Sequence, residues 1–428
     1  MPSEHRNATA QLALVRRTVA RELEPLALPG DDEDLTAAGL VDSMTRVNVL
    51  LAIEEAAGVP GFAAGWLDDR PFSVRELSAS LLQARTPPAD AAVGDQPGAD
   101  NRQASEVSVV GWAASPGSVV VPAENVDDEC KFPPGFLRER TGIESVRRAS
   151  KDENEIVLAA RAAEGTLEMA GLSPADVDLL VAVSTTCLGF PSFAASVHAE
   201  LLLREAVGAI DVGGACCGVL YALATAAALL STINGRAALV VASEVNSRRL
   251  ASLDSPPEFR ALFGDAACAF ALKRADAGQG VPGRRLREFV WGASSTFASA
   301  LRVSWPEGGV PQVQFRGEQL AGAAITLLER VIDRLSVMSA VDLPQVNQFA
   351  LHEPNPRVAA MLAQRAGIPL EKMPQTSRTW GNLGSATCGV NLCKALTATN
   401  GAGGGRRPPA ILAAAVGPGL LWGGAFIA

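Results

Sequence analysis

The 428-residue sequence predicts a large α/β domain built from two duplicated halves, preceded by a small all-α domain. Three observations support this fold class. A helix end, a proline turn and a strand-like run occur twice in the larger part. A segment poor in large apolar residues separates the two parts, and the acidic charge is concentrated ahead of it.

Residues 1–84 form the predicted all-α domain. Helix-like spacing of apolar residues covers 10–23 and 45–57, and 72–77 opens a final helix. This part holds 13 acidic residues against 7 Lys or Arg, a net charge of −6 out of −9 for the chain. An acidic face suits docking onto basic patches of a partner, although acids also simply keep a small helical domain in solution.

Residues 85–105 form the predicted linker. They contain Thr86-Pro87-Pro88 and Pro97-Gly98, with few large apolar side chains. Such a composition is typical of a flexible connection between domains.

Residues 106–428 form the predicted α/β domain, and an internal repeat supports its duplicated halves. The segment 168–181 recurs loosely as 337–350, and each copy reads as a helix end, a Pro-containing turn and a strand. His352 then follows the strand of the second copy, where the side chains of functional sites often lie in α/β folds.

Cys216 is the first candidate functional residue. It lies within the segment 211–218, just ahead of an apolar stretch that starts at Val219, so a strand turns into a buried helix there. Only the thiolate attacks acyl groups, and the partial positive charge of a helix N-terminus favours the thiolate. A lone buried cysteine is more often an inert core residue, which makes the partners downstream decisive.

Two nitrogen-bearing residues complete the candidate set. His352 follows the strand-like run 348–351, and Asn382 lies in the loop 381–385. Both side chains can donate hydrogen bonds to an acyl partner, and Asn does so without titrating. The alternative for Asn382 is an ordinary turn residue, because Asn next to Gly is common in turns.

These residues resemble those of the β-ketoacyl-acyl-carrier-protein synthase III family of the thiolase superfamily, across about residues 106–428. The resemblance also includes these motifs in order: Arg140-Thr141-Gly142-Ile143, Phe190-Pro191-Ser192, Phe263-Gly264-Asp265 and Leu421-Trp422-Gly423. It implies a thiolase-like fold of stacked α/β layers with two central helices, and usually a homodimer. It also implies that Cys216 takes an acyl group, while His352 and Asn382 hold the carbonyl of a malonyl thioester.

Residues 8–84 resemble an acyl carrier domain, because Asp42-Ser43-Met44 stands at a predicted helix start. The resemblance implies a four-helix domain in which Ser43 receives 4'-phosphopantetheine from a phosphopantetheinyl transferase. The alternative is that Asp42 or Ser43 merely caps the helix, which both residue types do readily.

The sequence departs from the family pattern at two places. The family's second oxyanion donor is an amide in a Gly-Gly-Gly loop, but here the loop is Gly417-Pro418-Gly419 and Pro418 has no N–H. Phe136 stands where many members have a tryptophan that stacks on the coenzyme A adenine. Arg248 matches the family's phosphate-side arginine. Coenzyme A thioesters therefore stay possible substrates, but the two departures favour acyl groups that a carrier protein delivers.

The composition argues against several other classes of protein. Seven cysteines without paired spacing and only three histidines argue against a disulfide framework and a metal site. There is no basic stripe for nucleic acid and no secretory pattern. The longest apolar stretch, 219–230, is too short to span a membrane and predicts a buried helix. We expect a cytoplasmic protein.

Three functions are consistent with these residues. The favoured one is a condensing enzyme, an acyltransferase that forms acyl-Cys216 and joins it to a malonyl-type thioester, in fatty acid or polyketide biosynthesis. The second is acyl transfer to a hydroxyl, amine or thiol without decarboxylation, which Pro418 keeps open. The third is a carrier or scaffold protein with little catalysis, which the complete Cys–His–Asn set disfavours.

Overall fold

The computed structural model describes residues 2–59, 62–66, 70–84, 107–275, 283–294, 300–307, 309–400 and 408–428, with only the backbone of 2–7, 43, 44, 64, 65, 318 and 319. The described residues form two compact units. One comprises the described parts of Met1–Arg102, Ser295–Leu301 and Phe315–Thr326, and the other comprises the described parts of the remaining chain. The predicted linker, 85–105, lies outside the described residues.

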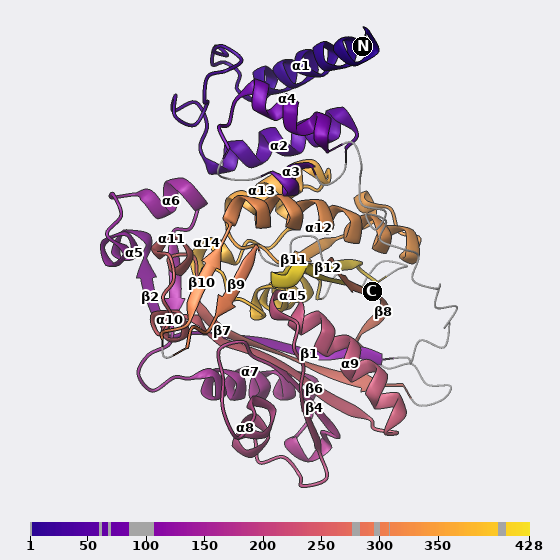
Figure 1. The fold of residues 1–428 in the computed structure, drawn as a ribbon. Helices are drawn as coiled ribbons and strands as arrows, with labels where there is room; N and C mark the ends of the chain where they lie inside the picture. Colours follow the sequence, from indigo (N-terminus) through magenta and orange to yellow (C-terminus); the bar gives the residue numbers. More distant parts are fainter. Residues whose placement is uncertain are drawn as a thin grey trace. The chain divides into compact units, whose positions relative to one another are not determined.

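The N-terminal part of the first unit is helical (Figure 1). Its helices are α1 (Pro2–Glu22), α2 (Ser43–Ala57), α3 (Phe62–Gly65) and α4 (Val74–Gln83). Apolar side chains spaced along these helices form a shared core, including Val19, Leu51, Phe72 and Leu77, each at most 1% exposed. The all-α prediction for this region is confirmed.

The first half of the second unit is built on five neighbouring strands of the main sheet. In spatial order these are β1 (Val107–Pro116), β7 (Asp265–Arg274), β6 (Ala237–Val245), β4 (Leu179–Val183) and β5 (Gly208–Asp211). Strand β4 pairs in parallel with β5 and β6, whereas β6–β7 and β7–β1 are antiparallel. One face of this half-sheet packs against α7 (Glu155–Ala170) and α8 (Phe193–Glu200).

The second half repeats this plan. Its strands are β8 (Arg284–Ala293), β13 (Leu421–Ile427), β12 (Ile411–Gly417) and β11 (Gln348–Leu351). Strands β11 and β12 are parallel, and β12–β13 and β13–β8 are antiparallel, the same series as β4, β6, β7 and β1. The helices of this half are α13 (Pro356–Arg365) and the part of α12 (Gly317–Ser339) that starts at Leu327.

The predicted repeat is therefore a structural duplication. In the first copy α7 is followed by the 3-10 turn η1 (Pro174–Asp176) and β4, and in the second α12 is followed by η3 (Leu343–Gln345) and β11. Among the described residues, the two half-sheets join at a short seam, where Ser108 and Val109 of β1 face Arg285 and Arg284 of β8.

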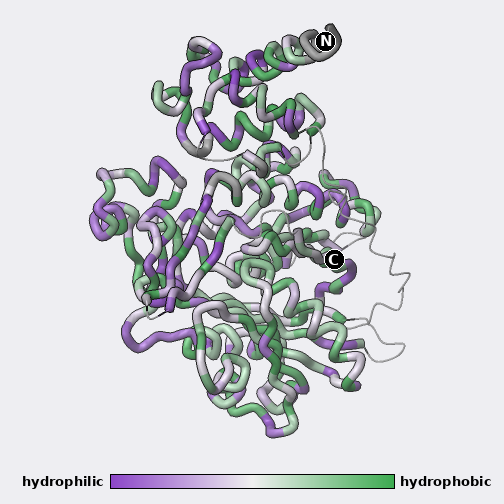
Figure 2. The backbone as a smooth tube through the Cα atoms, in the orientation of Figure 1, coloured by the Kyte–Doolittle hydropathy of each residue, from purple (hydrophilic) through white to green (hydrophobic). Residues whose placement is uncertain are grey.

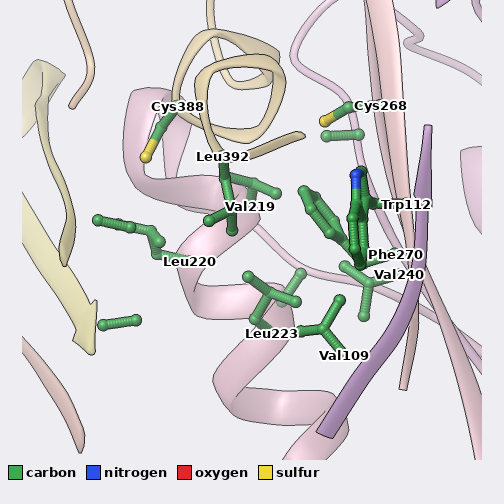
Figure 3. Packing of buried hydrophobic residues seen from close by; sticks show 14 of the residues in the cluster. Val109, Trp112, Val219, Leu220, Leu223, Val240, Cys268, Phe270, Cys388 and Leu392 are labelled. Atoms are coloured by element: carbon green, nitrogen blue, oxygen red, sulfur yellow. The ribbon is translucent and has the colours of Figure 1, made fainter. Parts of the chain in front are cut away.

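Two helices lie between the half-sheets and form the centre of an extended hydrophobic core (Figure 1). They are α9 (Gly218–Thr232) and α15 (Ala386–Thr399). Figure 3 shows Val219, Leu220 and Leu223 of α9 facing Leu392 of α15 and the strand residues Val109, Val240 and Phe270. The stacked layers with two central helices are confirmed.

Helix α9 and the residues ahead of it, Ala215–Thr232, are long and apolar enough to pass for a membrane span by composition. However, Val219, Leu220, Leu223 and Ala226 are at most 1% exposed inside the protein. The predicted buried helix is therefore confirmed. Figure 2 shows the same concentration of hydrophobic residues in the central layers.

The remaining elements connect these layers at their ends. They are β2 (Val119–Pro122), α5 (Ala123–Cys130), α6 (Phe136–Thr141), β3 (Ser145–Arg148), η2 (Ala215–Cys217), α10 (Asn246–Ala251), α11 (Pro257–Arg260), β9 (Leu301–Ser304), β10 (Gln312–Phe315), η4 (Leu370–Lys372), α14 (Ser377–Trp380) and η5 (Pro418–Leu420).

A glycine lets α9 approach β4 closely. A Cβ atom added to Gly218 would lie 2.5 Å from Cγ1 of Val183, far inside van der Waals contact. Gly165 in α7 offers a contrast, because its added Cβ would meet Ala113 at an ordinary 3.4 Å.

We expect Gly218→Ala to destabilise the protein by about 1–3 kcal/mol, because the new methyl group overpacks the core. Gly165→Ala is the matched control and should stabilise α7 by about 0.5–1 kcal/mol, because alanine loses less backbone entropy in a helix. Thermal unfolding midpoints of the two variants check this. A midpoint for Gly218→Ala at or above that of the wild type contradicts the expectation.

Candidate active site

Cys216 lies in a sharp turn at the start of the central helix. Strand β5 ends at Asp211, and η2 places Cys216 directly ahead of α9. Ala215, the preceding residue, has φ 46°, a left-handed conformation that costs a non-glycine residue free energy. The predicted strand-to-helix position is confirmed. The packing around the turn must compensate for the unfavourable backbone conformation of Ala215.

The surroundings of Cys216 oppose ionisation. Burial, with the negative charge of Glu244 as a second cause, raises the pKa of the Cys216 thiol to about 12. The residue is half-buried as a whole, but protein surrounds its sulfur. Burial therefore opposes the thiolate that the helix start is expected to favour.

Cys217, the neighbouring thiol, is part of the core. It is fully buried, and its Sγ donates hydrogen bonds to the carbonyls of Ala415 and Leu421, each at 3.2 Å. It has no exposed surface from which to meet an acyl donor. This arrangement favours Cys216 as the reactive thiol of the pair.

His352 directly follows β11 and is held there by its backbone. Its N–H donates to the carbonyl of Ala414 in β12 at 2.8 Å. The side chain is buried, and Nδ1 has no hydrogen-bond partner among the described residues. Burial lowers the pKa of His352 to about 4, so the imidazole is neutral at physiological pH and can accept a proton or donate one hydrogen bond.

Asn382 lies in the loop between α14 and α15, and its backbone is fixed on both sides. Its N–H donates to Leu262 at 2.7 Å, and its carbonyl accepts from Gly264 at 2.9 Å. Its side-chain Oδ1 accepts hydrogen bonds from Gly384 N–H and the Thr387 hydroxyl. Because the oxygen is engaged, Nδ2 is the group that this side chain can offer to a substrate.

The elements that carry the three residues meet at one end of the central core. A Cβ on Gly218, two residues after Cys216, would lie 3.5 Å from Cβ of Ser385, three residues after Asn382. Cys217 and His352 bind the carbonyls of Ala415 and Ala414, which are consecutive in β12. The fold therefore brings the segments that carry Cys216, His352 and Asn382 to the same end of the core, as the sequence analysis predicts.

The loop Gly417-Pro418-Gly419 adjoins the nucleophile. A Cβ on Gly417 would lie 3.0 Å from the Cys216 nitrogen. Pro418 opens the turn η5, and Gly419 has φ 74°, which favours glycine. The loop thus occupies the place expected of an oxyanion-stabilising segment, and its middle residue has no N–H to donate.

Glu244 is a residue near the site that sequence reasoning missed. It lies in β6, is 0% exposed, and its carboxylate accepts hydrogen bonds from the Thr185 N–H and hydroxyl at 3.0 Å and from the Ser385 hydroxyl. Burial raises the pKa of Glu244 to about 7. The signal in the sequence is a single carboxylate in the otherwise uncharged strand 237–245.

Arg248 and Phe136, the two residues connected with coenzyme A, lie on separate elements. The Arg248 guanidinium is on α10 and donates to the carbonyls of Ser150 and Glu153. Phe136 begins α6, with its ring 4.5 Å from that of Phe132 and under the Arg140 guanidinium at 5.8 Å. Both side chains already have protein partners.

Ser43 is the first residue of α2, and its side chain lies outside the described residues. Asp42 is the N-cap of this helix: its Oδ1 accepts from the N–H and the hydroxyl of Thr45, each at 2.8 Å. The capping role therefore belongs to Asp42.

Comparison with known protein families agrees with this geometry. Residues 210–294 match the 3-oxoacyl-acyl-carrier-protein (ACP) synthase III family, and residues 338–428 match its C-terminal part. Residues 120–251 match FAE1/type III polyketide synthase-like proteins.

Curated relatives match over about two thirds of the chain. The β-ketoacyl-ACP synthase III of Thermosynechococcus vestitus is 31% identical over 301 residues, covering 68% of this chain and 88% of that protein. The enzyme of the same name from Coxiella burnetii is 30% identical over 304 residues, covering 71% and 91%.

Solved structures share the fold. The 3-oxoacyl-ACP synthase III of Pseudomonas aeruginosa has a TM-score of 0.65 at 25% identity, covering 75% of this chain and 98% of that one. A priming β-ketosynthase of a polyketide biosynthetic pathway has a TM-score of 0.66 at 26% identity, covering 75% and 96%. OleA of Xanthomonas campestris, at 19% identity and a TM-score of 0.65, covers 76% and 98% and shares the fold alone.

Proposed function

Because the chain belongs to the 3-oxoacyl-ACP synthase III family, we propose that Cys216, His352 and Asn382 carry out its condensation reaction. The protein is a condensing acyltransferase of the ketosynthase III type. The observation that carries the residue assignment is the convergence of the Cys216 turn, the end of β11 and the Asn382 loop at one end of the buried core.

The first half-reaction is acyl transfer to Cys216. The sulfur attacks the thioester carbonyl, the thiol proton passes to the neutral His352 imidazole, and the donor's carbon–sulfur bond breaks. The proton then goes to the departing thiolate, so that His352 returns to its neutral form. A thiol whose pKa is near 12 needs such a base, and an imidazole whose pKa is near 4 leaves its lone pair free.

The second half-reaction joins the two substrates. The malonyl carboxylate leaves as CO₂, and the electron pair forms an enolate whose oxygen His352 and Asn382 stabilise through N–H groups. The enolate carbon attacks the acyl carbon, the bond to the Cys216 sulfur breaks, and the thiolate takes up one proton from the solvent. Asn382 suits this step because its bound Oδ1 leaves Nδ2 as the donor.

Plain acyl transfer without decarboxylation is the second candidate, and one observation supports it. Pro418 cannot donate at the loop beside Cys216, and loss of one oxyanion donor typically costs about 10²–10³ in rate. The third candidate, a scaffold with little catalysis, has no such support, and the assembled site argues against it.

We propose further that residues 1–84 form an acyl carrier domain with 4'-phosphopantetheine attached to Ser43 by a phosphopantetheinyl transferase. Support comes from the position of Ser43 directly after the Asp42 cap, at the start of a helix in a small helical region. A linker of about 20 residues spans roughly 25 Å on average, so the arm can deliver substrate at an effective concentration near the millimolar range.

Delivery by a carrier protein is supported over delivery by coenzyme A, whose thioesters stay possible substrates. The Arg248 guanidinium already binds backbone carbonyls, and Phe136 offers a smaller ring than tryptophan. The proposed location is the cytoplasm, supported by seven cysteines that are all free thiols.

A homodimer is the proposed assembly. Strand β5 is the last strand of its sheet, all four of its residues are exposed, and Ile210 lies on it. Among the exposed large apolar residues are also Phe190 at 102% and Leu202 at 86% exposure. An open strand edge and exposed apolar side chains are features that a second copy can cover.

His352→Ala and Asn382→Ala should each lose decarboxylation of the malonyl partner by at least about 10²-fold. Asn382→Ala should still form acyl-Cys216 as the wild type does, whereas His352→Ala should form it more slowly, because His352 is the base for the thiol. Mass spectrometry of the acyl-enzyme and release of labelled CO₂ measure the two steps. Cys217→Ala is the control and should keep the acyl label, whereas Cys216→Ala should lose it. Condensation near the wild-type rate in either of the first two variants would put plain acyl transfer first.

Co-expression with a phosphopantetheinyl transferase should add the mass of one phosphopantetheine arm to the wild type and none to Ser43→Ala. Ser73→Ala is the matched control, because Ser73 also stands at a helix start in this region, as the cap of α4. It should keep the mass gain. An arm on the Ser43→Ala variant refutes the carrier assignment.

Sedimentation velocity should give the mass of two chains, and Ile210→Asp should lower it to one by placing unpaired charges in the contact. Val337→Asp, at an exposed residue of α12, is the control and should sediment as the wild type does. A wild-type monomer at micromolar concentration counts against the dimer.

A further inference from the structure

A buried carboxylate connects the two halves of the duplicated domain close to the nucleophile. Glu244 lies near the end of β6, in the first half. One of its donors, Thr185, follows β4 in the same half, whereas the other, Ser385, stands directly ahead of α15 in the second half. A Cβ added to Gly384 would lie 3.5 Å from Glu244 Cγ, so the backbone of this loop lies against the glutamate.

This contact bears on Asn382. The loop 381–385 carries Asn382, and its last residue is the one that Glu244 binds. The same loop already holds the Asn382 oxygen through Gly384 N–H. A carboxylate that fixes both Ser385 and the neighbouring backbone therefore limits how far the Asn382 amide can move.

The same group acts on Cys216 through its charge. Glu244 is the largest cause, after burial, of the raised pKa of the Cys216 thiol. In a protein interior, a nearby negative charge disfavours a second one much more than it would in water. Burial raises the pKa of Glu244 to about 7, and the hydrogen bonds that it accepts oppose this rise, so the glutamate is mostly ionised at pH 8.

We propose that Glu244 is a positioning residue that acts through Ser385 on Asn382, and that its charge disfavours a second negative charge at Cys216. The inference rests on the proposed roles of Cys216 and Asn382. A buried ion is costly to a protein, and an apolar side chain in β6 would pack without that penalty. A role in the site accounts for the glutamate.

The charge is tested with Glu244→Gln, which keeps the shape of the side chain and an oxygen for Ser385. Cys216 should react with iodoacetamide about ten-fold faster than in the wild type at pH 8, equivalent to a fall of about one unit in its pKa. Peptide mapping assigns the label. Glu353→Gln is the matched control: Glu353 is also buried with a pKa raised to about 7, and its substitution should leave the Cys216 labelling rate unchanged.

The positioning is tested with Ser385→Ala, which removes the hydroxyl between Glu244 and the loop. Acylation of Cys216 should stay within about two-fold of the wild type, while kcat for malonyl decarboxylation falls about ten-fold or more, because a small displacement of a catalytic group is costly. Ser385→Thr retains the hydroxyl and should recover decarboxylation. Recovery of decarboxylation in Ser385→Thr would show that the hydroxyl is needed, since a loss caused only by changed packing would not be restored by a hydroxyl.

Wild-type labelling in Glu244→Gln together with wild-type decarboxylation in Ser385→Ala overturns the inference. That result leaves the proposed function intact if Cys216→Ala abolishes the acyl-enzyme and Asn382→Ala abolishes decarboxylation in the same experiments. If those two variants are active, the proposed function fails first. Unfolding midpoints measured for all variants identify any that do not fold.

Discussion

The contact between α9 and β4 sets the geometry of the site. With glycine at 218, the helix lies so close to Val183 that a Cβ would be only 2.5 Å from that side chain. Cys216 and Cys217 immediately precede the helix, so its depth in the core determines how far the thiol is removed from water. Ser385, ahead of the second central helix, packs against the same glycine. One close contact thereby aligns the starts of both helices.

A consequence of this depth is that the reacting groups are uncharged at rest. Burial makes both a thiolate at Cys216 and an imidazolium at His352 unfavourable. The chemistry then relies on proton movement that accompanies bond formation, rather than on a stored ion pair. The Cys216 thiol is thereby protected from non-specific alkylation or oxidation, because the protonated form is a poor nucleophile.

Sequence patterns predicted the parts of the fold and site that depend on local order along the chain. The repeat of helix, proline turn and strand identified the duplication and the position of His352 at a strand end, while the apolar run after Cys216 and the loop around Asn382 located the other two residues. The effect of burial on the Cys216 thiol was not predicted, because burial depends on residues far away in sequence, whereas a helix end acts locally. Glu244 was missed for a similar reason: its partners, Thr185 and Ser385, lie on other elements and only the folded chain brings them to it.

The duplication also left the two halves unequal. Continuing the register of the repeat beyond Val181 and Ala350 pairs Val183 with His352, at the ends of β4 and β11. At these corresponding positions, the first half has a valine whose side chain packs against Gly218 of α9, and the second half has the His352 imidazole. A histidine grafted at position 183 would have no room beside Gly218, so the molecule cannot regain two-fold equivalence by a point change.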